Sequence, residues 1–197
     1  MAGFSFGGRK GGFEAARQRF LNASRKFEER QWLVVQRAAL LMERELKKGI
    51  RSGRPGGKKF KKLAPTTRLL RRGSKPLIDT SALLGSITTT LIRHRKAAFV
   101  GVNRKSSRPG YSTFNVAIAH EFGTKPFVIP VTDKVRRFFW YLHVISGGKI
   151  KPLSENKTQI LHPGVPARPF IKPTLDKVRP KLQAVLAKTF VEGRGPF

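Results

Sequence analysis

One stretch of sequence decides the fold: Phe13–Lys48, FEAARQRFLNASRKFEERQWLVVQRAALLMERELKK. It contains neither proline nor glycine, the residues that most often interrupt a helix. Apolar side chains recur in it at seven-residue spacing, at Phe13, Phe20, Phe27, Val34 and Leu41. This spacing places them along one side of a helix, with charged side chains on the others. It predicts a helix over 13–48, roughly 54 Å long at 1.5 Å per residue. Such a rod is longer than one small domain needs, so we expect part of it to pack on a neighbouring subunit.

The sequence alone does not determine how far this helix extends. A bend near Arg30–Gln31 would divide it into two helices, and Gly49 is expected to end it, since glycine commonly follows the last helical residue. The glycine-rich residues 1–12 are predicted to form a flexible N-terminal arm, and 191–197 a C-terminal tail.

A basic loop is predicted over 49–78, where glycine and proline recur. Between Leu46 and Ile78 the chain has twelve basic residues and no acidic one. Such a loop either contacts phosphate groups, or is solvated, or binds an acidic protein surface. The candidate residues that face nucleic acid or a partner are Lys58, Lys59, Lys61, Lys62, Arg68, Arg71 and Arg72.

Short elements are predicted after the loop. The β-branched segments Ser86–Arg93 and Ala97–Val102, joined by a turn at Arg95–Lys96, predict a hairpin. Asn115–Glu121 predicts a short helix that ends at Gly123.

Further elements are predicted towards the C-terminus. Phe127–Val131 is β-like, Asp133–Val144 is helical with Thr132 as its cap, and 149–153 and 158–161 form a weak strand pair. The last helix starts at about Thr174, and Pro180 within it predicts a kink or a start close to Arg179.

Composition narrows the class of protein. The chain has 197 residues and a formal net charge of +30, from 41 basic and 11 acidic residues. This excess attracts polyanions, so we expect the protein to work beside nucleic acid or acidic partners. It has no cysteine, hence no disulfide or thiolate metal site, and no apolar stretch long enough to span a bilayer. The N-terminus lacks the apolar segment of a secretory signal.

Enzyme activity is not expected, and neither a metal nor a cofactor is predicted. The acidic residues are scattered, although a metal-dependent phosphotransferase needs them clustered. His120-Glu121 suggests a metallohydrolase, but position 124 is threonine where the second histidine is required. Lysines and arginines can bind phosphates without reading the base sequence.

The chain contains four motif blocks, in order Phe60–Thr67 with Pro76–Ile87, Val100–Asn103, Val116–Gly123 and Val165–Ile171. Together these blocks resemble the tailed-phage virion morphogenesis and tail-completion family, which includes the Mu-type proteins. The first block resembles the family's PL-x-D-T-G-x-L-x-x-S-I, with Ser81 in place of glycine. The third resembles its Y-A-x-x-H-x-F-G, with Val116 in place of the common aromatic residue.

The resemblance implies an α+β subunit in which a small antiparallel sheet is flanked by helices, with a core over 79–190 and an insertion at 124–165. It also implies structural or subunit-interface roles for Asp79, His120, Glu121, Phe122, Gly123, Pro166, Arg168, Pro169 and Phe170. The Arg168 guanidinium is expected to pair with Glu121 or Asp79, in its own or the next subunit. His120 and Phe122 are expected to fix the short helix against the sheet.

The function implied is that of a structural virion protein in the phage neck or head-proximal tail. Its copies would form a homo-hexameric ring around the DNA channel and join tail to head, beside connector, terminator and tail-tube proteins. Assembly would take place in the host cytoplasm, without a membrane. A ribosomal or ribosome-assembly RNA-binding protein is the alternative, and a basic nuclease that uses Glu121 is a third hypothesis.

Overall fold

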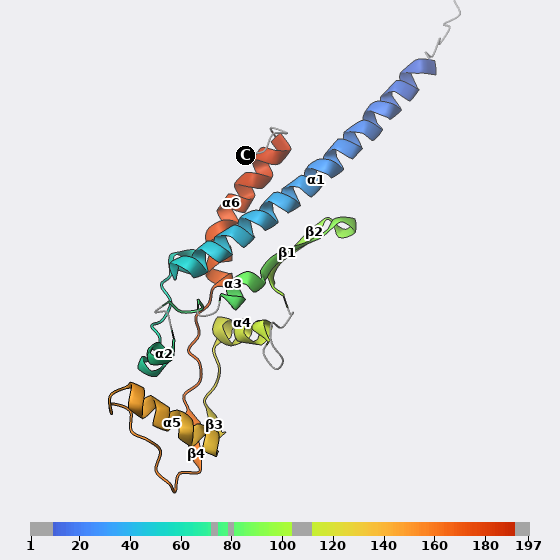
Figure 1. Ribbon diagram of the computed structural model, residues 1–197. Helices are drawn as coiled ribbons and strands as arrows, with labels where there is room; N and C mark the ends of the chain where they lie inside the picture. Colours follow the sequence, from blue (N-terminus) through green and yellow to red (C-terminus); the bar gives the residue numbers. More distant parts are fainter. Residues whose placement is uncertain (1–9, 72–74, 79–80, 104–111, 192–197) are drawn as a thin grey trace, which may run out of the picture.

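The computed structural model describes residues 10–71, 75–78, 81–103 and 112–191, and its fold is α+β (Figure 1). A long N-terminal helix, two small antiparallel sheets and flanking helices make up the chain. The elements are α1 (Lys10–Ser52), η1 (Pro55–Gly57), α2 (Pro65–Leu70), α3 (Ala82–Ser86), β1 (Ile87–Ile92), η2 (Arg93–Arg95), β2 (Ala97–Val102), α4 (Thr113–Phe122), β3 (Phe127–Pro130), α5 (Asp133–Ile145), β4 (Gln159–His162) and α6 (Ile171–Val191).

Helix α1 is continuous, so the alternative with a bend near Arg30–Gln31 is wrong. It begins at Lys10, within the predicted arm, and the remainder of that arm lies outside the described residues. Gly49 does not end it: Gly49 lies inside the helix, where a Cβ would approach the Pro55 Cα to 2.9 Å. The glycine that follows the helix is Gly53, whose φ of 68° suits the left-handed conformation of a helix end.

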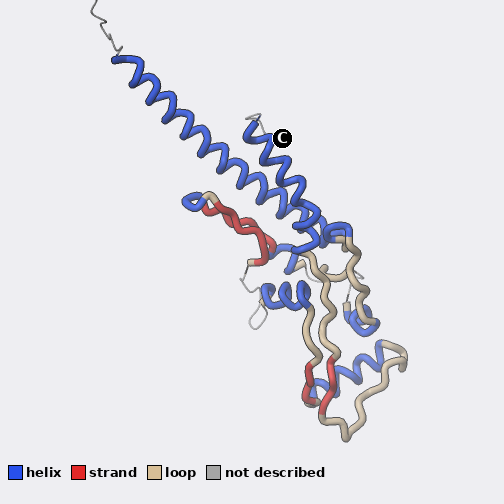
Figure 2. The backbone as a smooth tube through the Cα atoms, turned by 180° about the vertical axis from the view of Figure 1, so that it is seen from behind, coloured by secondary structure: helices blue, strands red, loops and turns tan. Residues whose placement is uncertain are grey.

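Helix α6 starts beside η1 and runs back along α1 (Figures 1 and 2). Its start at Ile171 lies before the predicted positions at Thr174 and Arg179. Pro180 lies inside the helix and is exposed, so the carbonyl that it leaves without an intrahelical partner lies on the solvent side. Val191 belongs to this helix, and the rest of the predicted tail lies outside the described residues.

The predicted hairpin is confirmed as β1 and β2, which pair antiparallel from Ile87 opposite Val102 to Ile92 opposite Ala97. It packs against α1, where the Thr89 hydroxyl donates a hydrogen bond to the Glu43 carboxylate. The turn between the strands is formed by η2 and Lys96, so it begins at Arg93, before the predicted position at Arg95–Lys96. The core lies where the hairpin, α3, α4 and α6 meet the C-terminal half of α1, and its buried residues are Met42, Leu46, Ile50, Phe60, Leu77, Leu83, Ile87, Val102, Ala117, Phe170 and Val178.

The insertion at 124–165 forms a separate small unit of β3, α5 and β4 at the far end of the molecule (Figure 1). The predicted pairing of 149–153 with 158–161 is wrong, because β4 pairs with β3 and 149–153 is not a strand. The Arg136 guanidinium instead donates hydrogen bonds to three carbonyls that precede β4, those of Ser154, Glu155 and Lys157. Thr132 precedes α5 as predicted, but its side chain accepts no capping hydrogen bond.

The basic region 49–78 is not wholly a loop, because it includes the end of α1, η1 and α2. The short helix predicted over Asn115–Glu121 is confirmed as α4, and the Ser112 hydroxyl accepts a hydrogen bond from the Asn115 amide at its start.

Candidate nucleic-acid or partner interface

The basic segment, residues 58–71, is fixed to the core by two apolar side chains. Phe60 and Leu63 are buried, whereas Lys58, Lys59, Lys61 and Lys62 around them are exposed. Burying the two apolar side chains stabilises this path, at roughly 1.5–3 kcal/mol each before the entropy of ordering the chain is subtracted. The four lysines are therefore held at the surface by the packing of their neighbours.

Arg168 also holds this segment, through its backbone. Its side chain is buried, at 5% exposed, and its Nε and Nη2 each donate a 3.0 Å hydrogen bond, to the carbonyls of Lys61 and Lys62 respectively. Burial lowers the pKa of Arg168, and the nearby positive charge of Arg71 lowers it further. Within this chain the Arg168 guanidinium lies against backbone carbonyls and not against Glu121. The predicted pair with Asp79 lies outside the described residues, and a pair with the next subunit stays a prediction.

Glu121 binds the start of helix α6 instead. Its Oε2 accepts hydrogen bonds from the amides of Phe170 at 2.8 Å and Ile171 at 3.0 Å, and its Oε1 accepts one from Lys172 at 3.1 Å. The first amides of a helix have no intrahelical partner and carry partial positive charge. A carboxylate there satisfies three of them and joins α4 to α6.

The third and fourth motif blocks lie side by side, and we call residues 120–124 with 165–172 the joint. The amide of Arg168 donates to the His120 carbonyl at 2.6 Å, and the Thr124 amide donates to the Val165 carbonyl at 3.0 Å. Gly123 has φ 80° and ψ 175°, a conformation almost restricted to glycine, and a Cβ there would lie 3.0 Å from the Val165 oxygen. The joint therefore requires glycine at this position.

His120 is neutral at pH 7. Burial, followed by the positive charges of Arg168 and Arg71, lowers its pKa to about 4. Its Nδ1 is buried and has no hydrogen-bond partner among the described residues. A neutral imidazole is tolerated at this position. An imidazolium would be unfavourable, because it would place a third positive charge beside the guanidinium groups of Arg168 and Arg71.

The other predicted site residues are more dispersed. Phe170 is buried in the core, and Pro166 and Pro169 are exposed on the chain that enters α6. Phe122 is 77% exposed, so the prediction that it fixes α4 against the sheet is wrong. Arg68 is exposed and Arg71 is partly buried, whereas Arg72 and Asp79 lie outside the described residues.

Ser81 stands where the family pattern has glycine, and it adopts a left-handed conformation, with φ 57° and ψ 5°. This conformation carries no steric cost for glycine but is unfavourable for other residues. The position therefore has the backbone of a glycine, although the side chain differs.

An exposed aromatic side of α5 was missed by the sequence reasoning. Trp140 and Tyr141 are more than half exposed, as is Val144, while Leu142 between them is buried. Trp140 and Val144 are four residues apart and share one side of the helix. The alternation of buried and exposed apolar residues was not visible in the pattern, because apolar residues lie on both sides of this helix.

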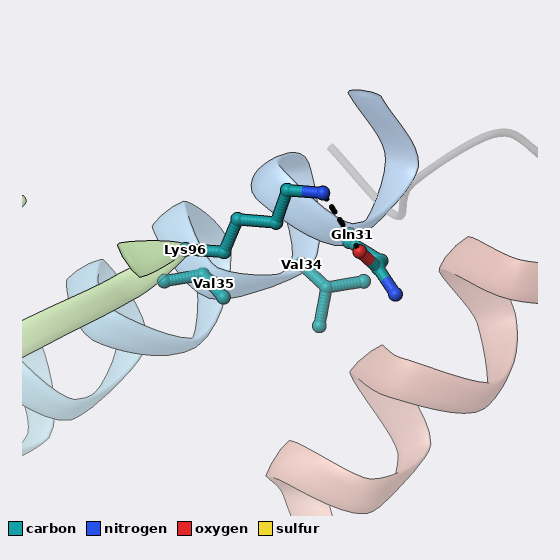
Figure 3. Close-up of a pocket in the computed structure, with 4 residues that line it drawn as sticks. All are labelled: Gln31, Val34, Val35 and Lys96. Carbon is teal, nitrogen blue, oxygen red and sulfur yellow. Dashed lines mark hydrogen bonds between the residues drawn. The ribbon is translucent and has the colours of Figure 1, made fainter. Parts of the chain in front are cut away.

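A shallow pocket of about 290 Å³ lies where the hairpin turn meets α1, lined by Gln31, Val34, Val35 and Lys96 (Figure 3). The Lys96 Nζ donates a 3.3 Å hydrogen bond to the Gln31 side chain and lies 3.6 Å from a Glu28 carboxylate oxygen.

Within the described ranges, no three histidine, aspartate or glutamate side chains lie close enough to hold a metal ion. None of the helices in the part of the chain that the structure describes is both long and apolar enough to cross a membrane. No family model, curated protein or solved structure matches the chain.

Proposed function

We propose that this chain is a structural subunit of a phage neck or head-proximal tail, whose copies form a ring around the DNA channel and join tail to head. The observation that carries the proposal is the joint. Two of the four motif blocks, the third and the fourth, lie against each other there, and their residues Glu121 and Arg168 hold helix α6 and the basic segment. Their role is to position surfaces, which is what an assembly subunit requires.

Ser81 is compatible with this proposal. Glycine stands at its position in the pattern that the first block resembles, and Ser81 here adopts a left-handed conformation that glycine takes without steric cost. The glycine of that pattern would therefore fit this backbone.

The charge also favours a subunit of an assembly. The net charge is +30 per chain, so a hexamer would carry a formal charge of about 180 around one axis. Such a charge requires DNA in the channel or acidic rings above and below. The exposed lysines of the basic segment would supply part of it at the lumen.

The direct test is electron microscopy of the purified protein together with the composition of purified virions. Rings in class averages, and the chain among the virion proteins, are the expected results. A chain that remains monomeric at high concentration and is absent from virions would overturn the proposal. Sedimentation with ribosomes after nuclease treatment would instead favour the RNA-binding alternative.

The role of the basic segment is tested by replacing Lys58, Lys59, Lys61 and Lys62 with glutamine. DNA affinity should fall, and the dependence of log K on log salt concentration should become shallower, because fewer counterions are released. The matched control replaces Lys151, Lys157, Lys177 and Lys181, which are also exposed. An equal loss in both variants would show that only total charge matters.

A further inference from the structure

The C-terminal half of α1 has an exposed side that is opposite the core. Arg44, Lys48 and Arg51 are exposed there, and their spacing of four and three residues places them in one row along the helix. They follow, by two positions each, the buried residues Met42, Leu46 and Gly49. Two positions turn an α-helix by about 200°, so the row is directed away from the core. We call Arg44, Lys48 and Arg51 the basic face.

The two acidic residues of this half of α1 do not neutralise the basic face. The Glu43 carboxylate accepts hydrogen bonds from Lys47 and from Thr89 of the hairpin, and Glu45 is buried, at 9% exposed. The side chains of the basic face make neither an ion pair nor a hydrogen bond with any other residue that the structure describes. Their three charges are therefore free to bind a partner.

The basic segment adjoins the basic face. The Phe60 amide donates a 3.0 Å hydrogen bond to the carbonyl of Gly53, the residue directly after α1. The exposed lysines on either side of Phe60 are therefore held next to the end of the helix. Lys75 approaches from another segment, and its Nζ donates a 3.5 Å hydrogen bond to the Arg51 carbonyl. The basic face and the basic segment thus form one cationic surface.

The helix end accounts for only part of this row of charges. Cations in the last turn of a helix are stabilised by the partial negative charge of its unpaired carbonyls. Only Arg51 of the basic face lies in that turn. Arg44 lies about two turns before the end of α1, where this effect has faded. The stability of the helix therefore does not explain why the whole row is cationic.

We propose that the basic face binds the phosphate backbone of double-stranded DNA without reading the base sequence. The row is about 10 Å long at 1.5 Å per residue, and a DNA duplex carries one negative charge per about 1.7 Å of its axis. Each of the three cations can therefore lie beside a phosphate of the same duplex. One chain carries the whole surface, so the inference goes beyond the proposed function and does not rest on the ring.

The composition of the surface favours a duplex over other polyanions. Phe60 is the only aromatic residue within 40–71, and it is buried. Proteins that bind single strands stack the bases on exposed aromatic side chains, which this surface lacks. Closely spaced cations also repel one another, which favours a partner whose negative charges are equally dense. The regular backbone of a duplex meets this condition.

The salt dependence of DNA binding tests the inference. The variant of the basic face carries Arg44→Gln, Lys48→Gln and Arg51→Gln, and the slope of log K against log salt concentration should become shallower by about 2.7, at about 0.9 per phosphate contact. The same residue types in the exposed N-terminal half of α1 give the matched control: Arg19→Gln, Lys26→Gln and Arg30→Gln. The control should change the slope by less than about 0.9, the value of one contact.

Equal changes of slope in the two variants would overturn the inference, because they would show that only net charge matters. An unchanged slope in the variant of the basic face would overturn it as well. Polyglutamate and a single-stranded oligonucleotide are the probes for an acidic protein and for single strands. Each should bind the wild-type protein at least tenfold more weakly than the duplex at equal concentration of charge, and equal affinity of either would contradict the assignment.

Electron microscopy of the wild-type protein separates the two proposals. Rings together with an unchanged slope would overturn the DNA contact of the basic face and leave the proposed function standing. A protein that forms no rings, but whose slope changes as expected, would have the opposite meaning.

A second measurement uses the wild-type protein alone. An amine-reactive reagent labels exposed lysines, and mass spectrometry gives the extent of labelling at each one. Duplex DNA should reduce labelling of Lys48 at least fivefold, whereas labelling of Lys26, which is also exposed on α1, should fall less than twofold. Equal protection of the two lysines would contradict the inference, because only Lys48 belongs to the basic face.

Discussion

Replacing Glu121 tests whether the joint holds the fold together. In the wild-type protein its carboxylate accepts hydrogen bonds from the amides of Phe170, Ile171 and Lys172. Glu121→Ala leaves these amides without their acceptor and removes a negative charge from the start of α6. Glu121→Gln keeps one acceptor oxygen in nearly the same shape, so the two variants separate the hydrogen bonds from the charge.

The magnitude follows from these contacts. A carboxylate at a partly buried helix start contributes up to about 2 kcal/mol. Leaving buried amides unsatisfied costs about 1–3 kcal/mol more. We expect Glu121→Ala to lower the free energy of unfolding by about 2–4 kcal/mol and Glu121→Gln by about 1–2 kcal/mol, against the roughly 5–15 kcal/mol typical of a whole domain.

Urea unfolding followed by circular dichroism measures this change, and hydrogen exchange locates it. The amides of Phe170–Lys172 should exchange faster in both variants. The exposed Glu155, replaced in the same two ways, is the control for loss of a negative charge. The reasoning is refuted if Glu121→Ala is within 0.5 kcal/mol of Glu155→Ala, or if exchange at the start of α6 does not change.

Three further predictions concern the joint and the first motif block. Arg168→Ala should lower the free energy of unfolding by about 2–3 kcal/mol, because the Lys61 and Lys62 carbonyls lose their donors. It should also increase proteolysis within 58–71. Arg179→Ala, on the exposed side of α6, is the control. The folded-state pKa of His120, about 4, is below its ordinary value of 6.5, so its contribution to stability is full above pH 6.5 and is lost as the pH falls through 4. That contribution is up to about 3 kcal/mol, and urea midpoints at pH 7 and 4.5 should differ less in His120→Gln than in the wild type. Ser81→Gly should raise the free energy of unfolding by about 1 kcal/mol, since glycine adopts the left-handed conformation without steric cost; a decrease in thermal stability would contradict this.

Local elements were predicted well where one pattern dominated. The long helix, the hairpin and the short helix before Gly123 all follow from residue periodicity over a few turns or strand positions. The end of α1 was placed wrongly because Gly49 serves close packing against Pro55 rather than a left-handed turn. The strand predicted over 149–153 does not form. There the Ile150 amide donates a hydrogen bond to the Ser146 hydroxyl, and the Ile150 carbonyl lies 2.8 Å from His143 Nδ1, so both backbone groups bind side chains at the end of α5 instead of a neighbouring strand.

The sequence identified residues of the candidate site but did not predict which groups they bind. Glu121 and Arg168 were both singled out, and a mutual ion pair was one expected arrangement. In the structure each binds backbone groups instead, Glu121 the first amides of α6 and Arg168 two carbonyls of the basic segment. A sequence shows which charges are present, but it does not show which amides and carbonyls are left without partners when the elements meet.

By itself, the sequence determined the charge, the absence of cysteine and the apolar side of the long helix, since these depend on residue identity and on spacing along one element. Only the tertiary structure decided how far that apolar side is covered. Val34 is buried and Phe20 exposed on the same side of α1, because the hairpin and α6 extend only part of the way along it. The periodicity shows that the apolar side of α1 needs other apolar side chains to cover it. The length and position of distant segments determine which part of that side this chain covers itself.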